Sequence, residues 1–346
     1  MRIGFLVNQI PTEVPQYTTT LLAHEAVTRG HEAYYLDVGQ FSYRPDERLV
    51  LGARAAPPGR YADPFAYLDA VQGPLAEEVA LDVRDLDVLF LRNDPAQDAG
   101  ERPWAQYVGI QFGQQAVARG VLVLNDPSGL SHALDKLYFQ SFPPEIRPNS
   151  LITRDPAEIR AFLLEEERSI VLKPLQGSGG RSVFHVRREE RDNLNQMIEA
   201  VSRDGYVVAQ EYLPLAAEGD IRFFLLNGEP LRDGDRYAVL RRIAAEGDLR
   251  SNMHRGGRAE RAEVTDDMLR IADLVRPKLV QDGLYLVGLD IVGDKVLEIN
   301  VFSPGGLHSA NETQGASFPR VILEDLERKI RLARWNRPEN AVLATL

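Results

Sequence analysis

The chain of 346 residues contains no cysteine, and its six histidines include no His-Glu-x-x-His pair. Disulfides, zinc–thiolate sites, iron–sulfur clusters and cysteine nucleophiles are therefore excluded, and nothing supports a zinc hydrolase. A Gly-x-Ser-x-Gly turn is also missing, which leaves no support for a serine hydrolase. Any metal must be held by oxygen or imidazole ligands.

Long apolar runs are absent as well. No segment approaches the roughly 18 uninterrupted apolar residues that a membrane span requires. The start Met1-Arg2-Ile3-Gly4 lacks the basic residues and apolar run of a signal peptide. We therefore expect a cytoplasmic protein with no membrane partner.

The chain also lacks an excess of basic residues, since its formal net charge is −11. Nucleic-acid binding is not expected, because phosphate contacts along a nucleic acid need clustered Lys and Arg. A local pocket of arginines can still hold a small phosphate or carboxylate. The length and the 44% hydrophobic content predict two or three domains.

Three segments with different patterns follow one another along the chain. Residues 1–125 alternate strand and helix signals, with strands at 2–8, 31–36, 86–92 and 121–125, which predicts an open parallel α/β domain. Residues 126–213 begin with a helix at 131–140 and continue as a small α+β module, with strands at 150–153, 170–174, 182–186 and 206–213 and helices at 157–166 and 190–201. Residues 214–346 carry strands at 221–227, 237–243, 284–292 and 296–301 and helices at 265–281 and 321–335.

A glycine-rich loop follows one of these strands. Lys173 ends the strand, and Gly177, Ser178, Gly179 and Gly180 come before the next one. Such a loop can place backbone N–H groups against phosphates, while the lysine supplies a positive charge. A glycine-rich hairpin turn with a surface lysine is the alternative, because the loop matches neither a P-loop nor a dinucleotide fingerprint.

Residues 284–304 predict a hairpin that turns at Gly293-Asp294. Apolar residues alternate along both strands, and the opposite face carries Asp290, Glu298 and Asn300. With a three-residue loop over 293–295, Asp290 lies opposite Glu298, within about 5.5 Å between Cβ atoms. Clustered oxygens of this kind suit Mg²⁺. A half-exposed hairpin with a solvated polar face is the alternative.

Two further groups are candidates for ligand contacts. The strand end Gln210-Glu211-Tyr212-Leu213 could bind an adenine edge through its backbone, and Asp220 could accept hydrogen bonds from ribose hydroxyls. A solvent-facing strand end is the alternative. Six arginines gather nearby and suit carboxylate or phosphate binding, or else only balance the acidic chain: Arg222, Arg241, Arg242, Arg250, Arg255 and Arg258.

From residue 2 to about 328, the order of motifs resembles the bacterial glutathione synthetase family of ATP-grasp enzymes. The matching stretches are Leu91-Arg-Asn-Asp-Pro, Val123-Leu-Asn-Asp-Pro, Asp135-Lys136-Leu, the Ile170 to Gly180 segment, Ala209-Gln-Glu-Tyr-Leu-Pro, Gly219-Asp-Ile-Arg, Asn227-Gly-Glu-Pro, Gly288-Leu-Asp-Ile-Val-Gly-Asp and Glu298-Ile-Asn-Val-Phe-Ser-Pro. The resemblance implies an ATP-grasp fold and a ligase that activates a carboxylate as an acyl phosphate. The family substrates are γ-glutamylcysteine and glycine, the products are glutathione, ADP and phosphate, and a homo-oligomer is implied.

The resemblance also implies roles for single residues. Lys136 and Lys173 would bind the ATP phosphates beneath residues 177–180, residues 210–213 would hold adenine, and Asp220 would hold the ribose. Asp290, Glu298 and Asn300 would bind Mg²⁺, or Mn²⁺ in its place. Arg222 and Arg242 would face the transferred phosphate, and the substrate end would contain Arg250, Asn252 and Ser303.

Two stretches depart from the family pattern. Residues 231–237 are longer than the corresponding hairpin, and Gly305-Gly306 follow Ser303-Pro304 where the family is less rich in glycine. The second departure leaves open an ATP-grasp ligase for a different carboxylate and amine. Because a fold alone does not establish a function, a nucleotide-binding protein without catalysis is a further alternative.

Overall fold

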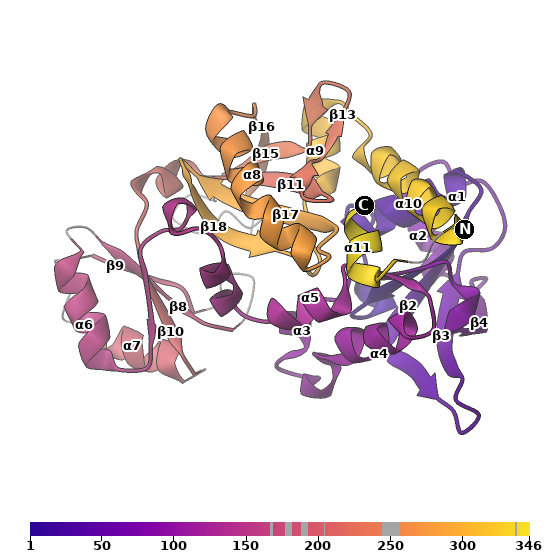
Figure 1. The fold of residues 1–346 in the computed structure, drawn as a ribbon, viewed down its shortest axis with the longest axis horizontal. Coiled ribbons are helices and arrows are strands. Elements are labelled where there is room, and N and C mark those ends of the chain that lie inside the picture. Colours follow the sequence, from indigo (N-terminus) through magenta and orange to yellow (C-terminus); the bar gives the residue numbers. More distant parts are fainter. Residues whose placement is uncertain (167–168, 177–181, 188–192, 204, 244–256, 336–337) are drawn as a thin grey trace.

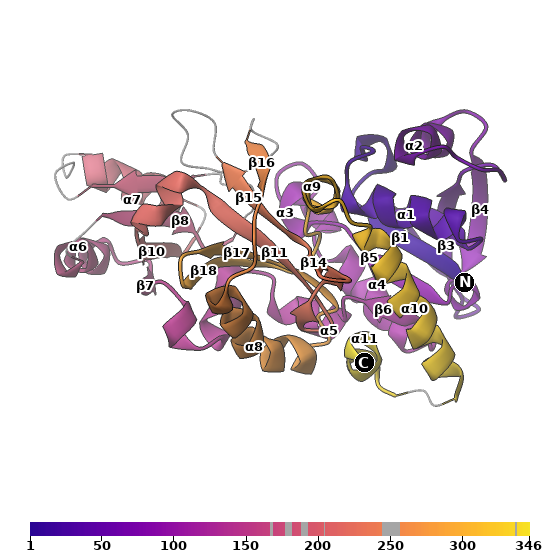
Figure 2. The same cartoon turned by 90° about the horizontal axis from the view of Figure 1, so that it is seen from above.

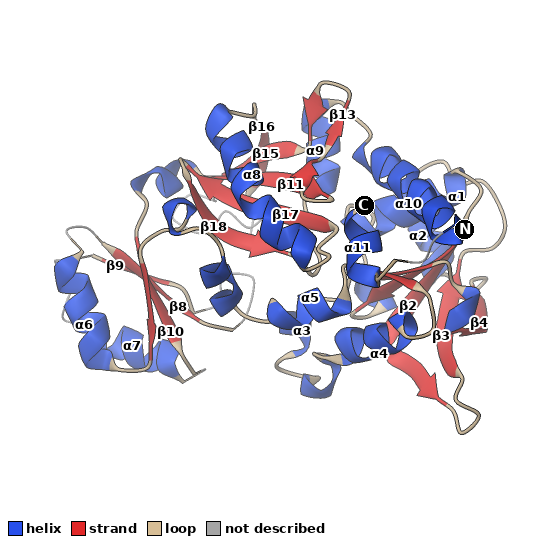
Figure 3. Cartoon of the chain, viewed as in Figure 1, coloured by secondary structure: helices blue, strands red, loops and turns tan. Residues whose placement is uncertain are grey.

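The computed structural model describes residues 1–166, 169–176, 182–187, 193–203, 205–243, 257–335 and 338–346. Three larger β-sheets follow one another along the long axis of the molecule, each with helices packed on it (Figures 1 and 3). The predicted residues Gly177, Ser178, Gly179, Gly180, Arg250 and Asn252 lie outside the described residues. No helix in the described part of the chain is both long and apolar enough to cross a bilayer.

The N-terminal sheet has the strand order β4-β3-β2-β1-β5-β6. Its strands are β1 (Arg2–Val7), β2 (Glu32–Tyr43), β3 (Leu49–Ala55), β4 (Glu77–Asp82), β5 (Val88–Leu91) and β6 (Leu122–Leu124). Strands β2, β1, β5 and β6 run parallel, which confirms the predicted open α/β domain. The sheet is nevertheless mixed, because β2 continues beyond the predicted strand and turns back into the antiparallel strands β3 and β4.

Helices cover both faces of this sheet, and the alternation of β1 decides which residues meet them. Ile3, Phe5 and Val7 belong to one apolar core with α1 (Thr18–Thr28) and α2 (Pro64–Gln72), whereas Leu6 faces α4 (Val108–Val117). The C-terminal helix α10 (Phe318–Trp335) packs against α1, and α11 (Asn340–Thr345) lies beside β6 (Figure 2). The end of the chain therefore returns to the first sheet.

The second sheet has the order β7-β10-β8-β9 and is antiparallel throughout. It comprises β7 (Ser150–Thr153), β8 (Ile170–Pro174), β9 (Phe184–Val186) and β10 (Val207–Glu211), and packs on α6 (Pro156–Glu165) and α7 (Leu194–Ser202) to form its own apolar core. The predicted helix at 131–140 is wrong. Instead, α5 (Pro127–His132) ends before a separate 3-10 segment, η4 (Lys136–Ser141), because the Asp135 side chain accepts a hydrogen bond from the Leu137 N–H at 2.8 Å and caps a new start.

The third sheet has the order β16-β15-β11-β17-β18, with β12 paired to β11. Its strands are β11 (Asp220–Leu226), β12 (Glu229–Pro230), β15 (Val239–Ile243), β16 (Arg258–Arg261), β17 (Leu286–Val292) and β18 (Lys295–Asn300). Helix α8 (Asp266–Gln281) buries Ile271, Val275 and Leu279 in one apolar core with β17, while α9 (Leu307–Gln314) packs near β15 and β16. The domain boundaries after residues 125 and 213 stay a prediction.

The stretch that is longer than the family hairpin forms a small ribbon of β13 (Arg232–Asp233) and β14 (Arg236–Tyr237). This ribbon splits the strand predicted at 237–243, and only β15 joins the third sheet. Arg236 Nη1 donates to the Gln314 carbonyl at 2.7 Å, so the ribbon is attached to the end of α9.

Candidate active site

The β17–β18 hairpin brings two carboxylates together, as predicted, but by a different route. Asp290 pairs directly with Glu298. The loop has two residues rather than three, because Val292 pairs with Lys295. A regular ladder from this turn would place Leu297 opposite Asp290 and point Glu298 to the other face. A register shift next to Asp290 leaves Leu297 as an extra residue and restores the carboxylate pair.

Asp290 belongs to a buried cluster of four charges on three adjacent strands. Arg222 of β11 lies opposite Asp290, with Nε at 2.6 Å from Oδ1 and Nη2 at 3.0 Å from Oδ2. Arg242 of β15 reaches Asp290 Oδ2 at 2.7 Å and donates to Asp220 Oδ1 at 2.8 Å. All four side chains are buried. Two cations and two anions therefore compensate one another away from water.

The electrostatics of the cluster follow from this geometry. Burial opposes the charge of Asp290, but the two guanidinium groups outweigh it and hold the pKa of Asp290 below its usual value. Burial likewise opposes the charge of Arg242, and the carboxylates of Asp290 and Asp220 raise its pKa. Asp220 is thus engaged by an arginine in this structure.

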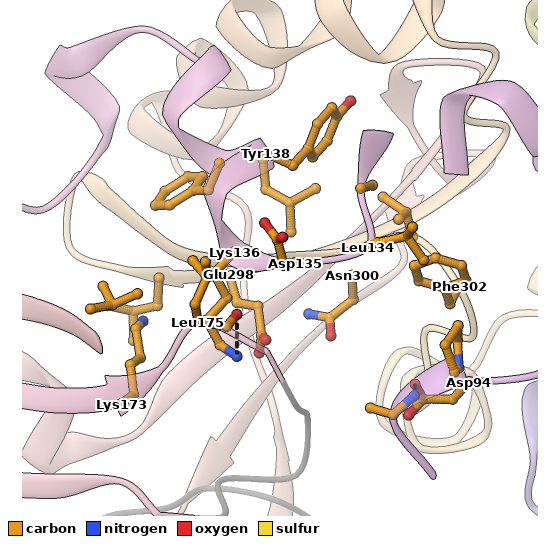
Figure 4. A pocket seen from close by; sticks show the side chains of 18 of the residues that line it. Asp94, Leu134, Asp135, Lys136, Tyr138, Lys173, Leu175, Glu298, Asn300 and Phe302 are labelled. Atoms are coloured by element: carbon orange, nitrogen blue, oxygen red, sulfur yellow. Dashed lines mark hydrogen bonds between the residues drawn. The ribbon is translucent and has the colours of Figure 1, made fainter. Parts of the chain in front are cut away.

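A pocket next to the four-charge cluster is lined by six of the residues that the sequence predicted for the site. Four of them are Lys136 of η4, Lys173 of β8, and Glu298 and Asn300 of β18 (Figure 4). The other two are Gln210 of β10 and Ser303, which follows β18. Lys173 Nζ donates to Gln210 Oε1 at 3.0 Å, and Lys136 Nζ donates to the Leu175 carbonyl at 3.5 Å. The pocket is joined to the four-charge cluster by Asn300, whose Nδ2 lies 3.2 Å from Asp290 Oδ2.

The two lysines are half-buried cations. Burial lowers the pKa of Lys173 to about 8, and it lowers the pKa of Lys136 as well. The charge of Glu298 acts in the opposite direction on both lysines. Asp135 and Asp94 also raise the pKa of Lys136, whereas the charge of Lys136 lowers that of Lys173. Two ammonium groups that face one pocket favour an anionic ligand there.

The strand end proposed for adenine lies at the edge of this pocket, and only Gln210 lines it. The Glu211 Oε1 atom accepts a hydrogen bond from the Asn149 N–H at 2.8 Å, so this side chain fixes the start of β7. The Tyr212 N–H donates to the Ser169 carbonyl at 2.9 Å, and its ring stacks on His185 with centroids 4.2 Å apart. The Leu213 N–H donates to no other described residue, which leaves it available for a ligand.

Oxygen atoms near Glu298 fit a hard divalent cation. The Glu298 carboxylate and Asn300 Oδ1 accept no hydrogen bond from the described residues, and both lie next to Asp290. This all-oxygen set suits Mg²⁺, which needs few protein ligands when phosphates and water complete its shell. Three or more His, Asp or Glu side chains do not gather as a preformed metal site within the described residues.

Three residues near the site belong to the sequence motifs above, but no function was predicted for them from the sequence. Asp94 and Asp135 line the pocket. Asn125 Nδ2 donates to the Val301 carbonyl at 2.6 Å and its Oδ1 accepts from the Leu286 N–H at 2.9 Å, so it joins β6 to the hairpin. The signal was the repeated Asn-Asp-Pro that follows β5 and β6, since polar residues at the carboxyl ends of parallel strands usually face a ligand.

Comparison with known proteins places these residues in a family. Residues 1–131 match the family described as "Prokaryotic glutathione synthetase, N-terminal domain", and residues 135–315 match "Prokaryotic glutathione synthetase, ATP-grasp domain". The glutathione synthetase of Mesorhizobium japonicum is 34% identical over 95% of this chain and 99% of its own length. That of Escherichia coli K12 is 31% identical, also over 95% of this chain and 99% of its own length.

Solved structures share the fold at lower sequence identity. D-cycloserine synthetase DcsG superposes with a TM-score of 0.62 at 16% identity, covering 94% of this chain and 99% of its own. The ATP-grasp ligase PsnB bound to a minimal precursor gives a TM-score of 0.58 at 19% identity, covering 95% of this chain and 98% of its own. These similarities confirm the predicted ATP-grasp fold.

Proposed function

The chain belongs to the prokaryotic glutathione synthetase family and is an ATP-grasp carboxylate–amine ligase, and from this premise we propose that it joins γ-glutamylcysteine to glycine. The carboxylate of the cysteine residue attacks the γ-phosphate of ATP and forms an acyl phosphate and ADP. The glycine amine then displaces phosphate, giving glutathione. The reaction belongs in the cytoplasm, where ATP is supplied.

One observation supports this proposal most directly: two half-buried lysines from separate elements converge with Glu298 in one pocket. Lys136 and Lys173 bind the triphosphate, to whose oxygens both ammonium groups can donate. Gln210 and the Leu213 N–H stand at the side where the adenine would lie. The predicted ribose contact of Asp220 remains a proposal, in addition to the hydrogen bond that this residue accepts from Arg242.

Asp290, Glu298 and Asn300 would hold Mg²⁺, which offsets the charge of the transferred phosphate when bound. The protein residues orient the reactants around that charge. Arg222 and Arg242 are held by Asp290 and Asp220, so their guanidinium groups are fixed before any substrate arrives. Ser303 lines the pocket just before Gly305 and Gly306, where the acyl substrate would lie.

The test is ADP production by the purified protein with Mg²⁺, ATP, γ-glutamylcysteine and glycine, each omitted in turn, with the product mass recorded. ADP and glutathione that appear only in the complete mixture support the proposal. ADP formation with another acid and amine, but not with this pair, would favour a different ligase. Tight ATP binding without turnover on any pair would indicate a nucleotide-binding protein.

A further inference from the structure

Next to the Pro304-Gly305 turn lies a buried arginine that the reaction described above does not use. Arg92 is 4% exposed and forms no ion pair with the described residues. Its Nε donates to Thr19 Oγ1 at 3.3 Å, and its Nη2 donates to the Pro304 carbonyl at 3.3 Å. Burial of a charge without a hydrogen-bonded counter-ion is costly, so an anionic ligand that paired with Arg92 would offset this cost.

A carboxylate without a partner lies near this arginine. Glu13 Oε2 is buried and accepts no hydrogen bond from the described residues. Burial raises the pKa of Glu13 to about 7, the charge of Arg92 lowers it, and the charge of Asp37 raises it. Glu13 also acts on Tyr17, whose pKa is raised first by burial and then by this charge. Arg92 and Glu13 thus influence each other without forming an ion pair.

The Pro304-Gly305 turn places this pair close to the four-charge cluster. The Pro304 carbonyl accepts from Arg92 and also from Thr18 Oγ1 at 3.0 Å. The next carbonyl, that of Gly305, accepts from Arg222 Nη1 at 2.8 Å. A substrate whose reacting end lies near Arg222 would therefore extend its other end along the turn toward Arg92 and Glu13.

We propose that Glu13 and Arg92 bind the α-ammonium and α-carboxylate groups of an amino-acid head on the acyl substrate. This inference rests on the proposed function, in which γ-glutamylcysteine presents such a head at the end remote from the reacting carboxylate. A zwitterion supplies a cation to Glu13 and an anion to Arg92 at once, so binding adds no net charge to the buried site. The guanidinium also provides the fork that a carboxylate prefers.

The test uses two substrate analogues with the wild-type enzyme. Glutarylcysteine lacks the α-ammonium group, and 4-aminobutanoylcysteine lacks the α-carboxylate. Each should lower kcat/KM about 10- to 100-fold relative to γ-glutamylcysteine, because one charge-assisted hydrogen-bonded contact is lost. The KM for ATP should not change.

Two variants then assign each charge to its partner. Glu13→Gln should lower kcat/KM for γ-glutamylcysteine by the same factor but leave kcat/KM for glutarylcysteine unchanged. Arg92→Met should likewise lower kcat/KM for γ-glutamylcysteine but leave that for 4-aminobutanoylcysteine unchanged. Glu101→Gln and Arg84→Met, both at exposed positions, serve as controls. Equal use of all three substrates by the wild type, or an equal loss on all three in Glu13→Gln, overturns the proposal. If Arg92→Met does not fold, the wild-type and Glu13→Gln results still decide. Failure of the proposed function looks different, since no glutathione then forms from the natural pair.

Discussion

Glu298 is the residue that links the proposed metal site to the two lysines proposed to bind the triphosphate. It is the carboxylate whose charge acts on both Lys136 and Lys173, and it faces Asp290 across the hairpin. Its own carboxylate accepts no hydrogen bond from the described residues, so its removal leaves no protein donor unpaired. A structural role and a catalytic role can therefore be separated at this position.

We expect Glu298→Gln to lower kcat by at least about 100-fold, because a metal ligand contributes several kcal/mol to the stabilisation of charge in the transition state. The melting temperature should stay within about 2 °C of the wild type, since the substitution keeps the size of a half-buried side chain that accepts no hydrogen bond from the described residues. ADP release at saturating substrates and a thermal melt measure the two quantities. Glu263→Gln, at an exposed position, is the control. A variant that keeps a third of the activity would refute the metal assignment.

The lowered pKa of Lys173 leads us to expect that ATP binding depends on pH. Its pKa in the free protein is about 8, lowered first by burial. The protonated form binds the triphosphate, and the bound triphosphate raises the pKa, so binding takes up a proton at pH values above the free pKa. The KM for ATP should thus be flat below about pH 7 and rise toward about tenfold per unit above pH 8.

Steady-state kinetics between about pH 6.5 and 9.5 check this dependence. Lys173→Met should show a high KM that no longer follows this titration. Lys136→Met should retain most of the dependence, because Lys173 still titrates. A wild-type KM that stays constant up to about pH 9.5 would show that Lys173 does not bind the triphosphate as an ammonium ion.

At the scale of secondary-structure elements, three strands combine to hold the arginines. Asp220 lies opposite Arg242, and Arg222 lies opposite Asp290, so the register of β15, β11 and β17 builds the charge cluster. Asp220→Asn would leave two buried guanidinium groups with one carboxylate. We expect a local destabilisation of about 3 kcal/mol, seen as roughly 100-fold faster hydrogen exchange of the β11 and β15 amides.

The matched control for this variant is Glu260→Gln on β16, where the ion pair with Arg258 is largely exposed. Exposed pairs contribute about 0–1 kcal/mol, so exchange in the control should change only a few-fold. Equal exchange rates in the two variants would mean that the cluster does not stabilise the sheet.

The β17–β18 hairpin and the segment at 131–140 show which features of the structure the sequence patterns could predict. The alternation along 284–301 predicted the hairpin and the carboxylate pair, since side chains on strands alternate whatever the surroundings. The bulge at Leu297 could not be seen, because it depends on how β18 packs rather than on which residues are apolar. For the same reason the periodic residues around 131–140 predicted one helix, although the cap formed by Asp135 divides it in two.

At the scale of the whole molecule, sequence order is a poor guide to which parts pack together. The helix at 321–335 was predicted from its apolar face, but such a pattern does not specify the partner. In the structure α10 packs on α1, about 300 positions earlier in the chain. Lys329 of α10 is fully buried, and its Nζ donates to the Leu343 carbonyl of α11 at 3.1 Å. This hydrogen bond joins the last two helices, and α11 in turn packs beside β6 of the first sheet.

Asn340 provides the test of this long-range connection. Its Oδ1 accepts from the Val123 N–H at 2.8 Å, and its Nδ2 donates to the Val123 carbonyl at 2.9 Å and to Asp126 Oδ2 at 2.7 Å. Asn340→Ala leaves both backbone groups of Val123 without these partners, at a cost of about 1–3 kcal/mol. Hydrogen exchange of the Val123 amide should therefore become roughly 5- to 100-fold faster, with no change on the second sheet. Asn195→Ala, which removes a contact with Arg160 on that sheet's helices, is the control. Unchanged exchange at Val123 would show that α11 does not stabilise the end of β6.

The same asparagine joins α11 to the strand that directly precedes Asn125, and Asn125 holds the β17–β18 hairpin. If α11 positions the hairpin through this strand, the Asn340→Ala variant should also lower turnover.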